Sequence, residues 1–192
     1  MKKLFLFLVV VCTMFLISSC GEKNVENVTI ILEDGREIRL ELYPDVAPLT
    51  VKNFLMLVDA KHYDGVVFHR VIEGFMIQTG GYYVSNGKLK EKPSVVQIYG
   101  EFSSNGFTNT LKHKAGVISM ARTTEKNSAS DQFFICSARS SHLDGEYAAF
   151  GKVRDNKSLR IVKEISRVET RKSNEFEDLP KEMITIKTIV RG

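Results

Sequence analysis

The feature that most constrains the fold is a succession of short β-rich runs separated by turn residues. The first two runs, residues 28–32 and 37–42, are alternating segments joined by Glu33-Asp34-Gly35-Arg36. Asp-Gly between two alternating runs is a strong signal for a β-hairpin. The chain is therefore expected to begin its folded part with two antiparallel strands.

The rest of the chain predicts more strands and two helices. Pro44 and Pro48 stop strand pairing, and Thr50 can then cap a helix that ends near residues 61–63. Residues 159–165 have helical spacing again. Gly, Asn and Ser turns separate the remaining runs, which predict strands at 66–72, 75–78, 95–99, 116–121, 133–137, 148–153 and 183–190. Residues 82–93, with three lysines, are expected to form a solvated loop. Many strands with two helices predict a mainly β fold, a closed sheet with helical lids.

The first twenty residues have the pattern of a lipoprotein signal peptide. Met1-Lys2-Lys3 is basic, and residues 4–17 form an apolar run too short to span a bilayer comfortably. The run ends in Leu16-Ile17-Ser18-Ser19-Cys20, which resembles a bacterial lipobox. We expect cleavage of residues 1–20 before Cys20 and lipid attachment there, which would place the protein at a membrane outside the cytoplasm. An ordinary signal peptide cut nearby and an uncleaved anchor are the alternatives.

Length and charge set the domain organisation and the class of partner. Residues 21–27 are a polar stretch that predicts a tether, and residues 28–192 are long enough for one domain with its own core. Residues 1–20 hold two lysines and no acids, so the net charge falls from +4 to +2 without them. Because this small charge is spread along the chain, no nucleic-acid partner is expected.

Cysteine and histidine usage predicts neither a disulfide nor a metal site. Without residues 1–20, Cys136 is the only thiol besides Cys20, and its run 133–136 reads as a buried strand. Packing is therefore its expected role. The histidines have no helical i, i+4 pair and no cysteine cluster beside them, which predicts structural roles for His62, His69, His113 and His142. No cofactor is expected either.

Separated sequence blocks carry most of the information about function. Residues 68–78 read Phe-His-Arg-Val-Ile-Glu-Gly-Phe-Met-Ile-Gln, and later come residues 132–135, 143–145 and 150–153. They place one always-charged guanidinium and two amides beside large apolar side chains, which suits gripping a peptide without cutting it. The blocks, their order and their spacing closely resemble the cyclophilin family of peptidyl-prolyl cis/trans isomerases, over roughly residues 28–190.

This resemblance implies a fold and a set of site residues. The implied fold is a closed eight-stranded antiparallel β-barrel capped by one helix at each open end, with the peptide on its outer face. Arg70 matches the arginine that hydrogen-bonds the substrate proline carbonyl and faces its nitrogen, with Phe75 and Gln78 beside it as catalytic residues. The other implied substrate-binding residues are Met76, Phe134 and Leu143 of the proline pocket, Gln132, Ala121 and Arg122 along the peptide backbone, and His142 and Tyr147.

The chemistry of isomerisation fits these residue types. Twisting an Xaa-Pro bond meets a barrier of about 18–20 kcal/mol, because amide resonance is lost, and it needs no nucleophile, metal or general base. A charge-assisted hydrogen bond from Arg70 is worth about 1.5–3 kcal/mol, which gives roughly ten- to a hundred-fold in rate if it strengthens in the transition state. Taken singly, each aromatic residue could instead be core and Arg70 a surface ion-pair partner of Glu73. The whole set of blocks, taken together, favours a substrate pocket over these separate structural roles.

Four positions depart from the family pattern. The well-known eukaryotic members carry tryptophan at His142, histidine at Tyr147 and asparagine at Arg122. Loss of the indole donor predicts weak cyclosporin binding. Asp131 replaces a small hydroxyl residue, and we expect it to add a negative charge near the groove with a modest effect on sequence preference.

The leading hypothesis is a lipid-anchored, monomeric prolyl isomerase that assists folding of unfolded or exported proteins at the cell envelope. The alternative is a binding module, a chaperone or assembly factor that holds proline-containing segments with incidental turnover. A surface-attachment protein using the lysine-rich stretch 82–93 is the weakest hypothesis, because its charges are scattered.

Overall fold

The computed structural model describes residues 24–173 and 175–192. The signal-peptide and lipid-attachment predictions therefore lie outside the described residues, as does the tether up to residue 23. In the described part, no helix has both the length and the apolar character needed to cross a membrane.

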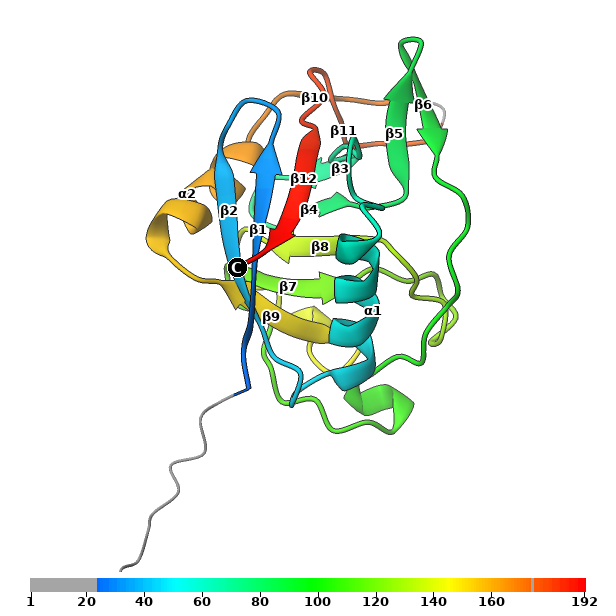
Figure 1. Ribbon diagram of the computed structural model, residues 1–192, viewed down its shortest axis with the longest axis vertical. Helices are drawn as coiled ribbons and strands as arrows, with labels where there is room; N and C mark the ends of the chain where they lie inside the picture. The colour runs from blue at the N-terminus through cyan, green and yellow to red at the C-terminus, as the bar shows by residue number, and fades with distance from the viewer. Residues whose placement is uncertain (1–23, 174) are drawn as a thin grey trace, which may run out of the picture.

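An eight-stranded antiparallel sheet with a helix on either side forms the body of the molecule (Figure 1). Its strand order is β12-β1-β2-β9-β7-β8-β4-β3. The sheet strands are β1 (Glu26–Leu32), β2 (Glu37–Leu42), β3 (Arg70–Ile72), β4 (Met76–Thr79), β7 (Val117–Met120), β8 (Phe133–Cys136), β9 (Ala149–Val153) and β12 (Ile186–Arg191). The helices are α1 (Pro48–Asp59) and α2 (Asn156–Ile165), and two small ribbons pair β5 (Tyr82–Ser85) with β6 (Lys88–Glu91) and β10 (Thr170–Arg171) with β11 (Leu179–Pro180).

The predicted first hairpin is confirmed. β1 and β2 pair antiparallel with Ile30 opposite Ile38, and the chain reverses at Gly35, whose φ of +83° favours glycine. β1 begins at Glu26, so the last two residues of the predicted tether belong to the sheet.

The predicted closed barrel is wrong, because the sheet is an open half-barrel between β3 and β12. Within the described residues, the segments that precede β3 and β12 touch at an isolated bridge between Val67 and Thr185 and through a few backbone hydrogen bonds nearby, and no continuous ladder joins the two strands. β3 is three residues long, and another segment occupies its outer edge, since the Val71 N–H donates to the Asp178 carbonyl oxygen at 3.0 Å. The short strand and its occupied edge prevent a continuous ladder with β12.

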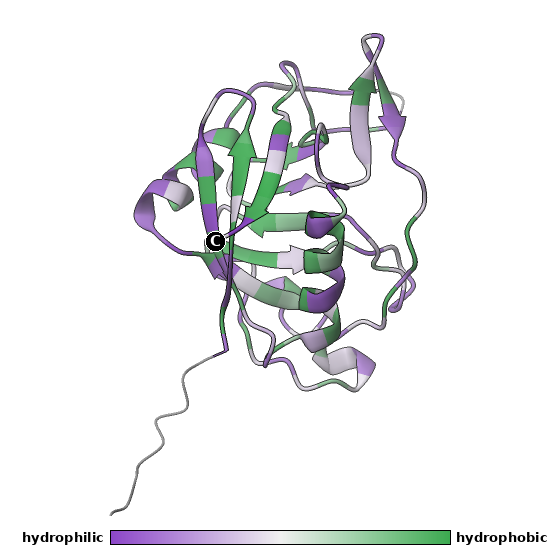
Figure 2. Ribbon diagram, in the orientation of Figure 1, coloured by the Kyte–Doolittle hydropathy of each residue, from purple (hydrophilic) through white to green (hydrophobic). Residues whose placement is uncertain are grey.

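The core lies between the sheet and the two helices. α1 contributes Val51, Phe54 and Val58, and the ring of Phe54 lies 5.2–5.4 Å from the rings of Tyr63, Phe133 and Phe150. α2 buries Ile161, Val162 and Ile165 in the same core. Figure 2 shows the apolar residues concentrated in the strands of the main sheet, whereas β6 is hydrophilic. The two predicted helices are thus both present, and each buries an apolar face in the core.

The predicted helix cap at Thr50 is wrong. α1 begins two residues earlier, at Pro48, and its N-cap residue Ala47 makes no side-chain cap. Proline suits this position because the first N–H groups of a helix lack an intrahelical partner. The carboxylate of the fully buried Glu101 accepts hydrogen bonds from Leu49 N, Thr50 N and the Thr50 hydroxyl at 2.7–3.0 Å. A carboxylate from a distant segment therefore caps the helix in place of Thr50.

Two other sequence predictions need correction. Residues 82–91 form the β5–β6 ribbon in place of the expected loop, because Asn86 and Gly87, at φ 52° and 71°, make a tight reversal between them. Residues 95–99 form no strand, and Ile98 makes only an isolated bridge to Ala129.

Removal of the Glu101 carboxylate is expected to destabilise the fold. In Glu101→Ala the buried donors at the start of α1 lose their acceptor, so the free energy of unfolding should fall by about 2–4 kcal/mol. Urea denaturation followed by circular dichroism measures this change. The exposed Glu182→Ala is the control and should stay within about 0.5 kcal/mol of the wild type. Equal stability of both variants would contradict the capping role.

Candidate active site

Side-chain alternation in three neighbouring strands builds a second apolar cluster outside the core. Val71 of β3, Ile77 of β4, and Phe133 and Ile135 of β8 belong to the main core. Successive strand residues face opposite sides, so their neighbours lie on the other face of the sheet. The outer cluster, hereafter the groove cluster, consists of Met76, Phe134, Cys136 and Leu143 with Ile72, Phe75, Ala121 and Tyr147 packed against them.

Strand register places two of the predicted catalytic residues, Arg70 and Gln78, in one row with the predicted substrate-binding residue Phe134 on this outer face. Arg70 of β3 is opposite Gln78 of β4, and Gln78 is opposite Phe134 of β8. Directly opposite residues in an antiparallel pair have Cβ atoms about 4.5–5.5 Å apart. The guanidinium, the amide and the aromatic ring are therefore close neighbours.

A cavity of about 110 Å³ opens over this row. Every residue that lines it is among those that the sequence singled out: Arg70, Phe75, Met76, Gln78, Ala121, Arg122, Phe134, Leu143 and Tyr147. One of the larger hollows, between residues 33–36 and 181–185 and about 490 Å³ in volume, is lined mainly by charged and polar side chains. Among the hollows in the described residues, the cavity of about 110 Å³ is the one that combines an apolar floor with Arg70.

Gln132 and His142 do not line the cavity. Gln132 supports it, because its side-chain oxygen accepts a hydrogen bond from Gln78 Nε2 at 2.9 Å. The chain of Gly80 passes so close that a Cβ there would lie 2.5 Å from Gln132 Cα, and its φ of +102° also favours glycine. His142 is exposed at the rim, with its ring 5.2 Å from that of Phe75.

Arg70 is held at the open side of the cavity. Its side chain is 42% exposed, and its Nε lies 3.8 Å from Asp178 Oδ2. Glu73, the alternative ion-pair partner weighed from the sequence, binds Arg167 instead at 3.2 Å. The guanidinium therefore has a carboxylate beside it and is still open to a ligand.

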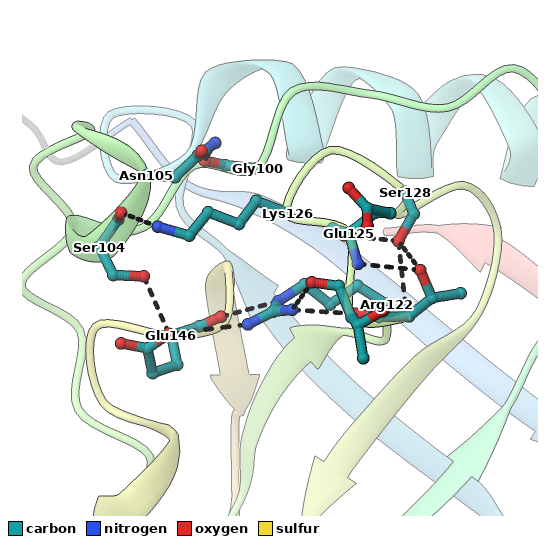
Figure 3. Close-up of polar contacts among 10 residues, drawn as sticks. Gly100, Ser104, Asn105, Arg122, Glu125, Lys126, Ser128 and Glu146 are labelled. Atoms are coloured by element: carbon teal, nitrogen blue, oxygen red, sulfur yellow. Dashed lines mark hydrogen bonds and ion pairs between the residues drawn. The ribbon is translucent and has the colours of Figure 1, made fainter.

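Arg122, which also lines the cavity, ties together the loops around it, as Figure 3 shows. Its side chain is only 12% exposed, and it donates to the backbone carbonyls of Thr123, Thr124 and Glu146 at 2.9–3.2 Å. The guanidinium also lies over the ring of Tyr147 at 4.7 Å. Ser104 and Lys126 extend the network, since Ser104 donates to the Glu146 carboxylate at 2.9 Å and Lys126 binds the Ser104 carbonyl. Arg122 thus fixes one wall of the cavity.

Comparison with known proteins identifies the family. A family model described as cyclophilin type peptidyl-prolyl cis-trans isomerase/CLD matches residues 27–191. This chain belongs to the cyclophilin family.

Curated relatives and solved structures agree with this assignment. Peptidyl-prolyl cis-trans isomerase A of Dickeya dadantii is 34% identical over 192 residues, which cover 97% of this chain and 96% of the relative. Peptidyl-prolyl cis-trans isomerase B of Bacillus subtilis is 40% identical over 136 residues, or 71% of this chain and 87% of the relative. A cyclophilin-type isomerase of Cryptosporidium parvum, solved in the presence of the dipeptide Ala-Pro, has a TM-score of 0.69 at 31% identity and covers 86% of this chain and 98% of its own. The prediction that the chain is a peptidyl-prolyl cis-trans isomerase is confirmed.

The carboxylate of Asp131, expected from the sequence to add charge near the groove, is buried and hydrogen-bonded to His62 in this cyclophilin. The residue is 7% exposed, and its Oδ2 lies 2.8 Å from His62 Nε2. Burial alone would raise the pKa of Asp131, but hydrogen bonds with His62 and Ser130 outweigh it and lower the pKa below its ordinary value. The carboxylate is therefore ionised, paired and turned away from solvent.

Sequence reasoning missed a polar network behind Phe134. The buried His113 lies 3.1 Å from Asp144 through Nδ1 and 3.1 Å from the Ser119 hydroxyl through Nε2. Its ring stacks on Phe134 at 6.1 Å. Ser119 is fully buried, so this arrangement supports the pocket floor and presents no nucleophile. Ser119 opposite Phe134 in the register is the signal that could have found it.

Neither the buried thiol near the site nor the metal-ligating side chains of the described residues form a reactive centre. Burial raises the pKa of the Cys136 thiol to about 12, so the thiol stays protonated near neutral pH. The described residues contain no group of three His, Cys, Asp or Glu side chains that could hold a metal ion.

His69, next to Arg70, is expected to make the fold sensitive to acid. Burial lowers the pKa of His69 to about 4 from 6.5, and its Nδ1 has no partner among the described residues. Because the folded pKa is depressed, the unfolded chain takes up the proton first, and stability present above about pH 6.5 is lost as the pH falls towards 4. The loss should reach about 3 kcal/mol.

Urea unfolding at pH 7 and pH 4.5 checks this prediction. His69→Phe keeps an aromatic ring between Tyr82 and Phe176 without a titrating group, so it should lose less stability than the wild type over this interval. The exposed His142→Gln is the control and should follow the wild type. An unchanged pH dependence in His69→Phe would show that His69 is not the acid-sensitive group.

Proposed function

We propose that this cyclophilin twists Xaa-Pro bonds in the cavity over the Arg70–Gln78–Phe134 row. The proline ring would lie against the groove cluster, and Arg70 would hydrogen-bond the proline carbonyl. The row itself carries the proposal, because the register puts a permanent cation, an amide and an aromatic floor on one small cavity.

The proposed role of Arg70 is to stabilise the twisted amide. As the C–N bond rotates, resonance is lost and the proline nitrogen becomes pyramidal, with its lone pair localised. A guanidinium that faces this nitrogen interacts more strongly with the twisted state than with either planar isomer, and such differential binding lowers the barrier. Arg70 needs no proton transfer for this, since a guanidinium stays protonated at all working pH values.

The rest of the cavity would hold the peptide in its twisted pose. Phe134 and Met76 are almost fully buried and so present a fixed apolar floor. The Gln78–Gln132 hydrogen bond fixes the amide beside Arg70, and the Arg122 network fixes the wall. A preorganised site spends less binding energy on ordering its own side chains.

We further propose that the isomerase acts on unfolded or exported proteins at the cell envelope, as a monomer held by lipid on Cys20. The apolar run at residues 4–17 followed by Leu16-Ile17-Ser18-Ser19-Cys20 supports this location. A pocket that recognises a ring and leaves the neighbouring residues loosely held suits many different clients.

Arg70→Ala is expected to slow catalysis roughly ten- to a hundred-fold. The variant loses the charge-assisted hydrogen bond to the proline carbonyl but keeps the apolar floor, so a peptide should still bind. NMR exchange spectroscopy on an Ala-Pro peptide measures the cis–trans rate directly, with residues 22–192 of the wild type and of the variant. Arg70→Lys keeps the charge without the planar fork and should fall between them.

The same experiment separates the enzyme from a binding module. Fast exchange by the wild type that slows roughly ten- to a hundred-fold in Arg70→Ala supports the proposal. Peptide binding by the wild type without faster exchange would favour a proline-binding chaperone. Fast exchange that survives in Arg70→Ala would refute the role of Arg70.

Mass spectrometry of the native protein tests the proposed anchor. We expect the mature chain to begin at Cys20 with a diacylglyceryl group on its sulfur. An unmodified Cys20 would refute the lipid anchor and leave the isomerase proposal intact.

A further inference from the structure

In the part of the chain that the structure describes, Asp178 supplies the one carboxylate within 4 Å of Arg70, and the mechanism above does not use it. We propose that Asp178 shifts the preference of the groove for the residue after the proline towards lysine or arginine and away from acidic residues. This inference rests on the proposed role of Arg70 at the proline carbonyl. That carbonyl belongs to the peptide bond of the following residue, whose side chain therefore leaves the backbone close to the Arg70–Asp178 pair.

The backbone holds Asp178 in place on one side of Arg70. Asp178 O accepts a hydrogen bond from Val71 N at 3.0 Å, which ties it to β3 directly after Arg70. The next residue, Leu179, is 2% exposed and belongs to β11. Asp178 thus sits at a fixed edge of the sheet.

Phe176 anchors the same segment on the other side of Arg70. Its ring lies 5.4 Å from that of His69, the residue directly before Arg70, and 5.0 Å from that of Tyr82. Residues 176 and 178 therefore contact His69 and Val71, the residues directly before and after Arg70. The Asp178 carboxylate is positioned at the guanidinium before any peptide arrives.

The other charged side chains around the cavity have partners of their own. The Asp178 carboxylate is therefore the one expected to act on a charged residue after the proline. Arg122 is shielded and lies beside Glu146, and Glu73 binds Arg167. Within the described residues, Asp178 is the only carboxylate within 4 Å of Arg70. Alone, the Arg70 cation would attract an acidic side chain and repel a basic one, and Asp178 offsets that preference.

The pair is also accessible enough for a peptide to sense it. The side chains of Arg70 and Asp178 are 42% and 35% exposed. Screening by water limits the energy of such a pair, so the effect on any one peptide is modest. The ratio of the rates for a basic and an acidic peptide is more sensitive than either rate alone, because the carboxylate favours one peptide and disfavours the other.

The test is the isomerisation of Ala-Ala-Pro-Lys, Ala-Ala-Pro-Glu and Ala-Ala-Pro-Ala peptides, with blocked ends, by the full chain and its Asp178→Asn variant. We expect the ratio of kcat/KM for the lysine peptide over the glutamate peptide to fall about three- to ten-fold in the variant. The change should shrink in about 1 M salt, where charges are screened within about 3 Å. Asp178→Glu should restore most of the ratio.

Glu177→Gln is the matched control, because Glu177 is the adjacent residue, carries the same charge and binds Lys172 instead. It should leave all three rates unchanged. Urea unfolding of each variant checks that the fold is intact. An unchanged ratio in Asp178→Asn would overturn the inference, as would an equal loss for all three peptides, which would mean that Asp178 only orients Arg70.

Arg70→Ala separates this inference from the function on which it rests. Fast exchange in Arg70→Ala would show that the proposed function itself is wrong. If Arg70→Ala is slow while Asp178→Asn keeps the wild-type ratio, only the selectivity of Asp178 is refuted.

Discussion

The strict alternation of side chains along β3, β4 and β8 is the constraint on which the rest of the structure depends. Each of these strands sends one residue into the core and the next onto the outer face, so the core and the groove are built from the same short stretches. A shift of one residue in any pairing would move Arg70 or Phe134 into the core and a core residue into the groove. The buried side of the sheet therefore fixes the geometry of the site.

The fold could be predicted from the sequence wherever the signal is local. The Asp34-Gly35 hairpin and the helical spacing of α1 and α2 depend on neighbouring residues, and they are confirmed. The Asn86-Gly87 turn was an equally local signal that the lysines around it obscured. The Glu101 cap and the open edge between β3 and β12 depend on partners far along the chain, which no local pattern reveals.

The candidate site shows the same division. All residues that line the cavity were named from the sequence blocks, because the resemblance gives their identity and order. What Asp131 and Arg122 do was not predictable, since their partners His62 and Glu146 lie 69 and 24 residues away. Asp178 was overlooked for the same reason, because only the fold brings it to Arg70. Sequence blocks thus identify a site, and long-range pairing decides how its charges are arranged.

A crystal structure of residues 22–192 with a bound Ala-Pro peptide tests the central claim most directly. The account predicts the proline ring against Phe134 and Met76, and Arg70 within about 3 Å of the proline carbonyl oxygen. A peptide bound in another hollow, or one in this cavity whose carbonyl does not contact Arg70, would contradict it.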